Sequence, residues 1–274
     1  MILINTLSLT PNVRSWLQNS RQTRILHVFD HACNLINERG EILSVVAQKI
    51  ENGPFNLVIE DGILFSGRLS VQSPISIQAN QLHIGDLVIH TADAKLWSPR
   101  PDWEDLHRKR EIILTQLAKL QIANYQFSNS LASNLSLALT NADIGTVKAI
   151  ASQLAGLGQG LTPSGDDIIL GAILAAWIIH PLDIAVDIAK EITNTAAPLT
   201  TSLSAAWLRS AGNGEAGALW HEFFATLLDM NTLHAQASMD KILAVGETSG
   251  ADALAGFIGT LISYAERETK LCHS

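Results

Sequence analysis

One stretch of the sequence carries most of the residues that could do chemistry: GLGQGLTPSGDDIILGAILAAW, from Gly156 to Trp177. Glycines, which let a backbone approach a ligand closely, surround a Thr-Pro-Ser turn, and the acids Asp166 and Asp167 follow it. Backbone N–H groups, hydroxyls and carboxylates therefore meet where an apolar helix should begin. Such a place can bind an anion, or hold a cation against the acids. The predicted catalytic residues are Asp166 and Asp167, and the predicted anion-binding residues here are Gly158, Gly160, Thr162, Ser164 and Gly165.

Two starts are possible for the helix. In the first, Thr162 is the N-cap and Pro163 the first helical residue. In the second, Ser164 is the cap and Asp167 completes a carboxylate variant of the capping box. A purely structural interpretation stands beside both, because acids in a first turn complement the helix dipole. The density of glycines favours function, since glycine loses the most backbone entropy on folding.

Known phosphate and metal motifs do not fit. Gly160 to Gly165 has Walker A spacing, but Asp166 stands where that loop needs Lys, and a carboxylate would repel phosphate. The segment from Val147 to Leu154 is predicted to be helical, which excludes a Rossmann fingerprint. The pair His221-Glu222 lacks the second His of a zinc motif. We therefore expect no nucleotide and no zinc, while Mg²⁺ at the paired acids stays open.

A second stretch repeats the first. Ser164 to Gly171 aligns without gaps with Ser249 to Gly256, and a Thr lies just upstream of each. If the two helix starts converge, two positive dipole ends would face one anion. The alternative is that Gly and Ala recur in tightly packed helices. The repeat adds these residues to the predicted anion site: Thr248, Ser249, Gly250 and Asp252.

Weaker candidates lie elsewhere. Thr201 belongs to a hydroxyl-rich segment after Pro198, which could cap a helix or contact a ligand. Arg209 could pair with a carboxylate or phosphate, although a solvated Arg is more common. Asn34 is a polar residue in a β-branched context.

The elements around these residues predict an α+β protein. Residues 24–97 consist of short β-branched runs broken by Gly- and Pro-containing turns, which predicts a small β-barrel or sandwich. Ser98 to Asp102, with two prolines, marks the boundary. Beyond it the hydrophobic period becomes helical, and the first predicted helix runs from Glu104 to Ala123. We therefore expect a β-rich domain over residues 1–100 and an all-α domain over 101–274 that carries the Gly-rich motif; residues 1–22 receive no assignment.

Composition excludes several classes. The chain has 274 residues, 47% of them hydrophobic and 16% charged, with a net charge of −8. This charge argues against nucleic acid or an anionic membrane as partner, and no apolar run reaches the ~18 residues of a transmembrane helix. The start lacks the basic region of a signal peptide, so we expect a cytoplasmic protein. Cys33 and Cys272 are far apart in the sequence, which favours free thiols over a disulfide.

The motif GLGQGLTPSGDD resembles the AllH family, a bacterial family long called a domain of unknown function and named for the AllH subunit of oxamate carbamoyltransferase in anaerobic allantoin breakdown. The similarity extends to further blocks: His31 to Ile36, Asn52 to Phe55, Thr200 to Ser204 and Thr248 to Asp252.

The resemblance implies a reaction in which carbamoyl phosphate and oxamate give oxalurate and phosphate, with partner subunits or a homo-oligomer. Amides around Gly158 to Gly165 could then stabilise developing negative charge. Asp166 or Asp167 could accept the proton of the attacking nitrogen or hold Mg²⁺. Two further hypotheses stay open: a non-catalytic binding or assembly subunit, and a Mg²⁺-dependent phosphoryl-transfer or hydrolytic enzyme. Whether the chain is catalytic alone, its acceptor and its metal requirement also stay open.

Overall fold

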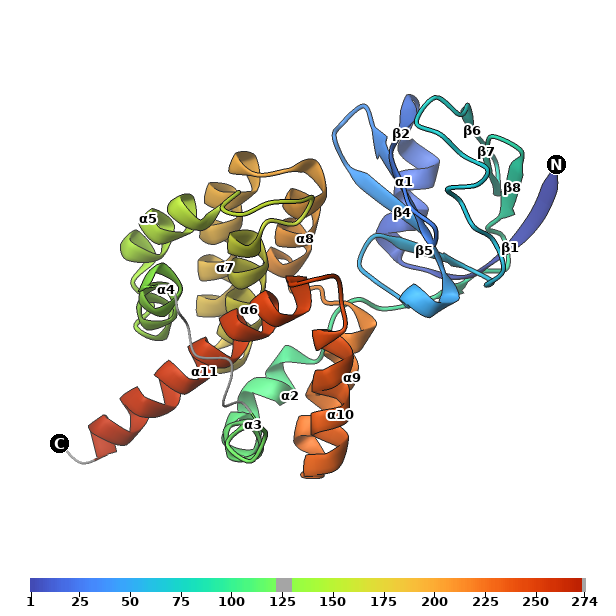
Figure 1. The fold of residues 1–274 in the computed structure, drawn as a ribbon. Helices are drawn as coiled ribbons and strands as arrows, with labels where there is room; N and C mark the ends of the chain where they lie inside the picture. Colours follow the sequence, from blue (N-terminus) through green and yellow to red (C-terminus); the bar gives the residue numbers. More distant parts are fainter. Residues whose placement is uncertain (122–129, 273–274) are drawn as a thin grey trace. The chain divides into compact units, whose positions relative to one another are not determined.

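A computed structural model describes residues 1–121 and 130–272, without the side chain of Cys272. The chain forms two compact units, Met1–Pro99 and Arg100–Ser274 (Figure 1). The first is rich in strands and the second is helical, so the predicted α+β class with its β-rich start is confirmed.

The N-terminal unit is built on one sheet that nearly closes into a barrel. Over the described residues its strands follow the order β2-β3-β4-β5-β1-β8-β7-β6, and β9 pairs with β1. The edge strands β2 and β6 contact each other, which explains the near closure. The bounds are β1 Ile2–Leu9, β2 Thr23–Val28, β3 Ala32–Asn37, β4 Ile42–Ala47, β5 Asn56–Ile59, β6 Ile75–Gln78, β7 Gln81–Ile84, β8 Leu87–His90 and β9 Lys95–Leu96, with a 3₁₀ turn at Gln48–Ile50.

The first twenty residues are structured, although their mixed composition gave no signal. β1 lies in the middle of the sheet, antiparallel to β5 and parallel to β8. Helix α1, Pro11–Asn19, follows at once: the Thr10 hydroxyl caps it by accepting from Val13 N, 3.2 Å away. Val13 and Trp16 pack into the same core as the strands. This start is therefore an integral part of the N-terminal core.

The apolar segment from Leu82 to Ile89 forms a hairpin of β7 and β8. Gly85 lies between them with φ +59°, a left-handed value that reverses the chain. Elsewhere in this core, Cys33 is free and buried, and burial raises the pKa of its thiol to about 12.

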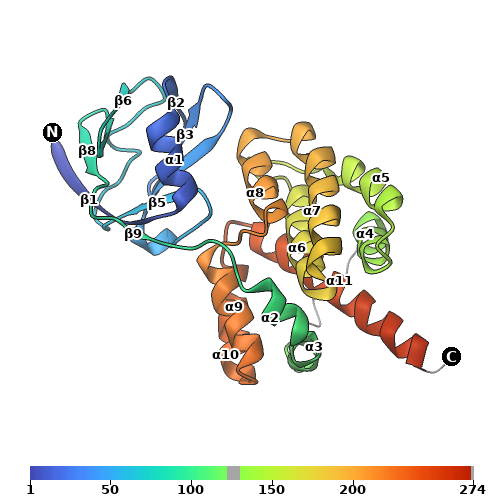
Figure 2. The same cartoon turned by 180° about the vertical axis from the view of Figure 1, so that it is seen from behind.

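The helical unit contains ten α-helices in the described ranges (Figures 1 and 2). Asp102 caps the first of them by accepting from Asp105 N. The helix predicted from Glu104 to Ala123 breaks at Lys109, and its last two residues lie outside the described part. The bounds are α2 Trp103–Arg108, α3 Arg110–Leu117, α4 Ser130–Thr140, α5 Ile144–Leu154, α6 Ser164–Ile179, α7 Leu182–Ala196, α8 Ser202–Gly212, α9 Ala218–Leu228, α10 Thr232–Leu243 and α11 Ser249–Cys272, with a 3₁₀ turn at Ala197–Leu199.

Helix α6 is the centre of this unit. It contacts α2, α4, α5, α7, α8 and α11, and nearly all of its side chains are buried. A helix that is apolar on every side can be stable only in such a position. None of the helices in the described ranges has the length and hydropathy needed to cross a membrane.

Candidate functional site

Helix α6 begins at Ser164, and Pro163 is its N-cap residue without a side-chain cap. Both predicted caps are therefore wrong. The reason lies in the backbone: Gly165 N donates to the carbonyl of Leu157 at 2.8 Å, and the amides of Asp166 and Asp167 donate to the carbonyl of Pro163. The loop itself satisfies three amides of the first turn, which leaves the side chains of the motif free for other contacts.

The loop before α6 depends on its glycines. Gly156, Gly158 and Gly160 have φ values of 73°, 126° and 90°. A Cβ on Gly158 would lie 2.7 Å from Ser164 N, and one on Gly165 would lie 2.0 Å from the carbonyl oxygen of Leu154. Gly158 thus keeps the first amide of α6 uncovered, and Gly165 lets the loop pack on α5.

This loop presents amides that have no protein acceptor. Residues 156–160 are exposed. In ranges 1–121 and 130–272, no acceptor is within hydrogen-bonding geometry of six N–H groups: those of Gly158, Gln159, Gly160, Leu161, Thr162 and Ser164. Successive free amides beside a helix N-terminus are what anion sites of proteins use.

Asp166 anchors the Gly-rich loop through hydrogen bonds. It is 1% exposed. One carboxylate oxygen accepts from Gly156 N at 2.9 Å. The other accepts from the hydroxyls of Ser204, at 2.7 Å, and Thr200. Both oxygens are therefore engaged in holding the loop against the start of α8.

Thr201 supports the same junction. Its hydroxyl caps α8 by accepting from Ser204 N at 3.1 Å and donates to the carbonyl of Leu161 at 2.5 Å. The hydroxyl-rich segment 200–204 thus joins the Gly-rich loop. Composition drew attention to that segment, but only the fold shows that Ser204 and Thr200 meet Asp166.

Asp167 has a different environment. It is 8% exposed, and one of its carboxylate oxygens is buried without a hydrogen-bond partner in the described structure. Burial raises the pKa of this carboxyl to about 7, and the negative charges of Asp252 and Asp166 add to the rise, against a hydrogen bond from the Ser249 hydroxyl that lowers it. Asp167 can therefore exchange a proton near neutral pH.

The second stretch of the repeat forms the same kind of helix start. Helix α11 begins at Ser249, and Gly250 N donates to the carbonyl of Val245 as Gly165 N does to Leu157. A Cβ on Gly250 would lie 1.8 Å from a carbonyl oxygen of α10, and one on Gly165 would lie 2.0 Å from a carbonyl oxygen of α5. Thr248 is exposed and its carbonyl accepts from Asp252 N.

The two helix starts meet. Thr162 Oγ1 lies 2.9 Å from Ser249 Oγ. A Cβ on Gly171 would lie 1.8 Å from the carbonyl oxygen of Ala253, and one on Gly256 would lie 2.0 Å from that of Ile168. Since Ile168 aligns with Ala253 in the repeat, the contact is reciprocal: each helix places its glycine on the backbone of the other. The expected convergence of the two helix starts is therefore present.

Other predicted residues have ordinary environments. Asn34 lies in β3 of the N-terminal unit, buried, and its side-chain oxygen accepts from Ser44 Oγ at 2.7 Å. Arg209 is exposed in the last turn of α8. Among the described residues, no group of three or more His, Cys, Asp or Glu is placed to hold a metal ion.

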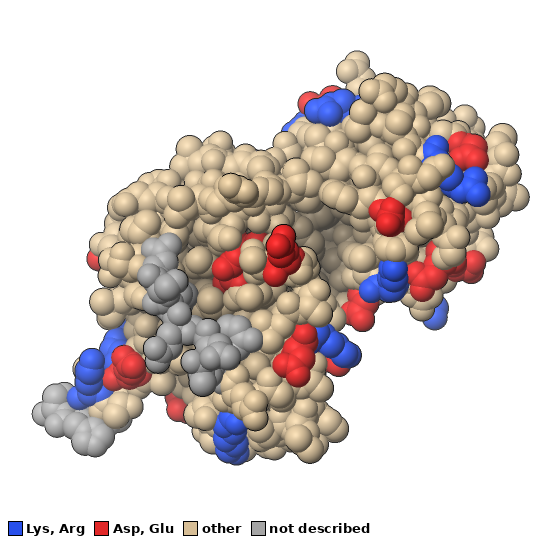
Figure 3. All heavy atoms as spheres, viewed as in Figure 1, with Lys and Arg blue, Asp and Glu red and all other residues tan. Residues whose placement is uncertain are grey.

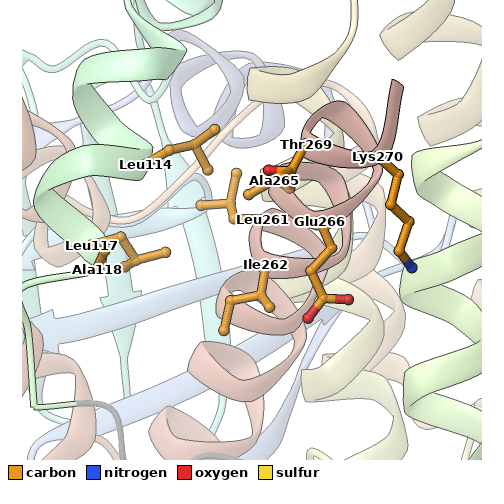
Figure 4. Close-up of a pocket in the computed structure, with 9 residues that line it drawn as sticks. All are labelled: Leu114, Leu117, Ala118, Leu261, Ile262, Ala265, Glu266, Thr269 and Lys270. Carbon is orange, nitrogen blue, oxygen red and sulfur yellow. The ribbon is translucent and has the colours of Figure 1, made fainter. Parts of the chain in front are cut away.

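A separate pocket of about 530 Å³ lies between α3 and α11 (Figure 4). Leu114 and Leu117 of α3 face Leu261 and Ile262 of α11 across it, and Lys270 and other polar residues of α11 lie at its edge. No predicted site residue lines this pocket. On the face drawn in Figure 3, Lys and Arg occur in small separate groups, several of them beside acids.

Comparison with known families covers both units. The model described as oxamate carbamoyltransferase subunit AllH matches residues 154–261, which include the Gly-rich loop and both helix starts. The model of the AllH family N-terminal domain matches residues 5–96. No solved structure matches the chain. Because the two matches together cover most of the sequence, the chain belongs to the AllH family.

Proposed function

We propose that this chain is a cytoplasmic subunit of a carbamoyltransferase-type enzyme that converts carbamoyl phosphate and oxamate into oxalurate and phosphate, in purine and allantoin nitrogen catabolism. It acts together with other subunits or further copies of itself. The description of the family supports the reaction class. The observation that carries the proposal is the run of unpartnered amides from Gly158 to Ser164, at the start of the helix that carries the buried and partly unpartnered Asp167.

The phosphate of carbamoyl phosphate binds to these amides. Such groups act as fixed partial positive charges, and the N-terminal end of α6 adds roughly half an elementary charge. The start of α11 contributes in the same way, since Ser249 adjoins Thr162. Gly158 leaves Ser164 N open to the ligand.

Carbamoyl transfer requires two kinds of assistance. As the amide nitrogen of oxamate attacks the carbamoyl carbon, negative charge grows on the carbonyl oxygen and then on the departing phosphate, and loop amides stabilise both. The attacking nitrogen must also lose a proton. Asp167 is the final acceptor of this proton, because its pKa of about 7 suits proton exchange. Asp166 accepts three hydrogen bonds already and positions the loop.

An assembly role is the second candidate, and one observation favours it. Gly171 and Gly256 allow α6 to pack closely on α11. A non-catalytic subunit would need the same close packing. Gly160 in the exposed loop has no such packing role, since a Cβ there would meet nothing within 4 Å.

The proposal is tested by assaying the chain purified together with the subunits that it assembles with. We expect oxamate-dependent release of phosphate from carbamoyl phosphate, with formation of oxalurate. In the Asp167→Asn variant the rate should fall by roughly 10²- to 10⁴-fold, the usual loss when a general base is removed. The Asp183→Asn variant is the control, since Asp183 is an exposed acid in the first turn of α7. An active assembly that is unaffected by the loss of Asp167 would contradict the proposed site.

A further inference from the structure

Asp167 cannot meet a ligand at the exposed loop through its free oxygen alone. That oxygen is buried, and so is one carboxylate oxygen of Asp252; neither has a hydrogen-bond partner in the described structure. Buried acceptors without donors are rare in folded proteins and need an explanation. A carboxyl group has one explanation of its own: it becomes a donor when it binds a proton.

The two acids occupy equivalent positions at the crossing of α6 and α11. Each lies one helical turn before the glycine that touches the other helix, Gly171 for Asp167 and Gly256 for Asp252. Residues four apart share a helix face, so both acids lie on the sides of the helices that meet. The negative charges of Asp252 and Asp166 both act on Asp167. Because like charges disfavour the ionised form, they favour the protonated carboxyl of Asp167.

Two hydroxyls connect this pair with the surface. Ser249 forms a hydrogen bond to the Asp167 carboxyl. Ser249 Oγ is 2.9 Å from Thr162 Oγ1, and Thr162 belongs to the loop whose amides are free. The chain of hydrogen-bonding groups therefore runs from the exposed loop through Thr162 and Ser249 to Asp167.

We propose that the hydroxyls of Ser249 and Thr162 form a proton path between a ligand at the Gly-rich loop and the buried carboxyl of Asp167, with Asp252 at the equivalent position of the facing helix. The inference rests on the proposed function in one respect, since the ligand whose proton is moved is the attacking amide. In the transfer, the N–H proton of that amide passes to Thr162 Oγ1. The hydroxyl proton of Thr162 passes to Ser249 Oγ, and that of Ser249 passes to the ionised Asp167. The N–H electron pair forms the new N–C bond, and phosphate leaves with the electrons of the broken C–O bond. Ser249 and Asp252 are positioning residues.

The first test needs no ligand. The full chain is labelled with ¹³C at aspartate carboxyls and titrated by NMR. We expect one carboxyl with a midpoint near pH 7 in the wild type. It should be absent in Asp167→Asn. In Asp252→Asn its midpoint should move down, because a neighbouring negative charge is lost. In Ser249→Ala it should move up, and in the control Asp183→Asn it should stay unchanged.

The same proton makes the stability of the folded chain depend on pH. The pKa of Asp167 in the folded state, about 7, lies above its ordinary value, so the native protein binds a proton that the unfolded chain releases. The stabilisation is present at low pH and is lost as the pH rises through about 7. Between pH 3.8 and about 7, the melting temperature of the wild type should therefore fall relative to that of Asp167→Asn.

The second test uses the active assembly. Ser249→Ala should lower kcat by roughly 10²-fold with little change in KM for carbamoyl phosphate, and Ser249→Thr, which keeps the hydroxyl, should restore the rate. The acidic limb of the pH–rate profile should shift down in Asp252→Asn. If no carboxyl titrates above its ordinary range in the wild type, or if Ser249→Ala keeps full activity, the inference is wrong. If the wild-type assembly transfers no carbamoyl group, the proposed function fails, and the ligand-free titration still decides whether Asp167 is linked to Ser249 and Asp252.

Discussion

Replacing Gly171 by alanine is expected to lower the free energy of unfolding by about 3 kcal/mol, the upper part of the range for an overpacked core. The added Cβ would lie 1.8 Å from the carbonyl oxygen of Ala253. No rotamer change can relieve a contact with backbone, so α6 and α11 must move apart at the centre of the helical unit. Urea unfolding measures the effect.

The control and the reciprocal variant make this prediction specific. Gly145 in α5 has only one atom near its virtual Cβ, the Asp143 carboxylate oxygen at 3.6 Å, so Gly145→Ala should be neutral or stabilising by up to about 1 kcal/mol. Gly256→Ala should resemble Gly171→Ala. The double variant should cost less than the sum of the two, since one separation of the helices relieves both clashes. A loss below about 1 kcal/mol for Gly171→Ala would show that the crossing is looser than described.

Replacing Asp166 by alanine is expected to cost about 3 kcal/mol of stability. The substitution leaves three donors without an acceptor: Gly156 N and the hydroxyls of Thr200 and Ser204. Buried donors that lose their partner cost about 1–3 kcal/mol each, and water entering the site recovers part of it. Urea unfolding gives the total, and hydrogen exchange at Gly156 reports the loosening of the loop.

Asp183→Ala is the matched control, because it removes an exposed acid from a first helical turn of the same unit. It should change stability by less than about 0.5 kcal/mol. If Asp166→Ala kept both its stability and the exchange rate at Gly156, the carboxylate would not be the anchor of the loop. A large loss of ligand binding in that variant would then have to come from direct contact.

The sequence was sufficient for the class of fold and for the location of the two helix starts. The alternation of short β-branched runs and the later helical period follow directly from which faces are buried. The repeat of Ser164 to Gly171 at Ser249 to Gly256 was visible, and its physical basis is the reciprocal contact between Gly171 and Gly256. Such a contact requires small residues at matching positions of both helices.

The distinction between the two acids could not be read from the sequence. Asp166 and Asp167 are adjacent and identical, yet one is bound by groups of α8 and the other faces Ser249 and Asp252. These partners are distant in sequence, and only the packing of α6 selects them. The cap was misassigned for a related reason, since a backbone bond between Gly165 and Leu157 replaces the usual side-chain cap. β1 was missed because its pairing partners, β5 and β8, are also distant.

The measurement that tests the central claim most directly is a thermal-shift titration of the purified chain with carbamoyl phosphate, beside phosphate and oxamate, each with and without Mg²⁺. At 100 times its dissociation constant, a ligand that binds only the native state stabilises it by about 2.7 kcal/mol. We expect a saturable shift with carbamoyl phosphate that is lost in Gly158→Ala, whose methyl group would lie 2.7 Å from Ser164 N. It should persist in Gly40→Ala, another glycine with positive φ but without neighbours. An equal shift in wild type and Gly158→Ala, or none in the wild type, would contradict an anion site at this loop.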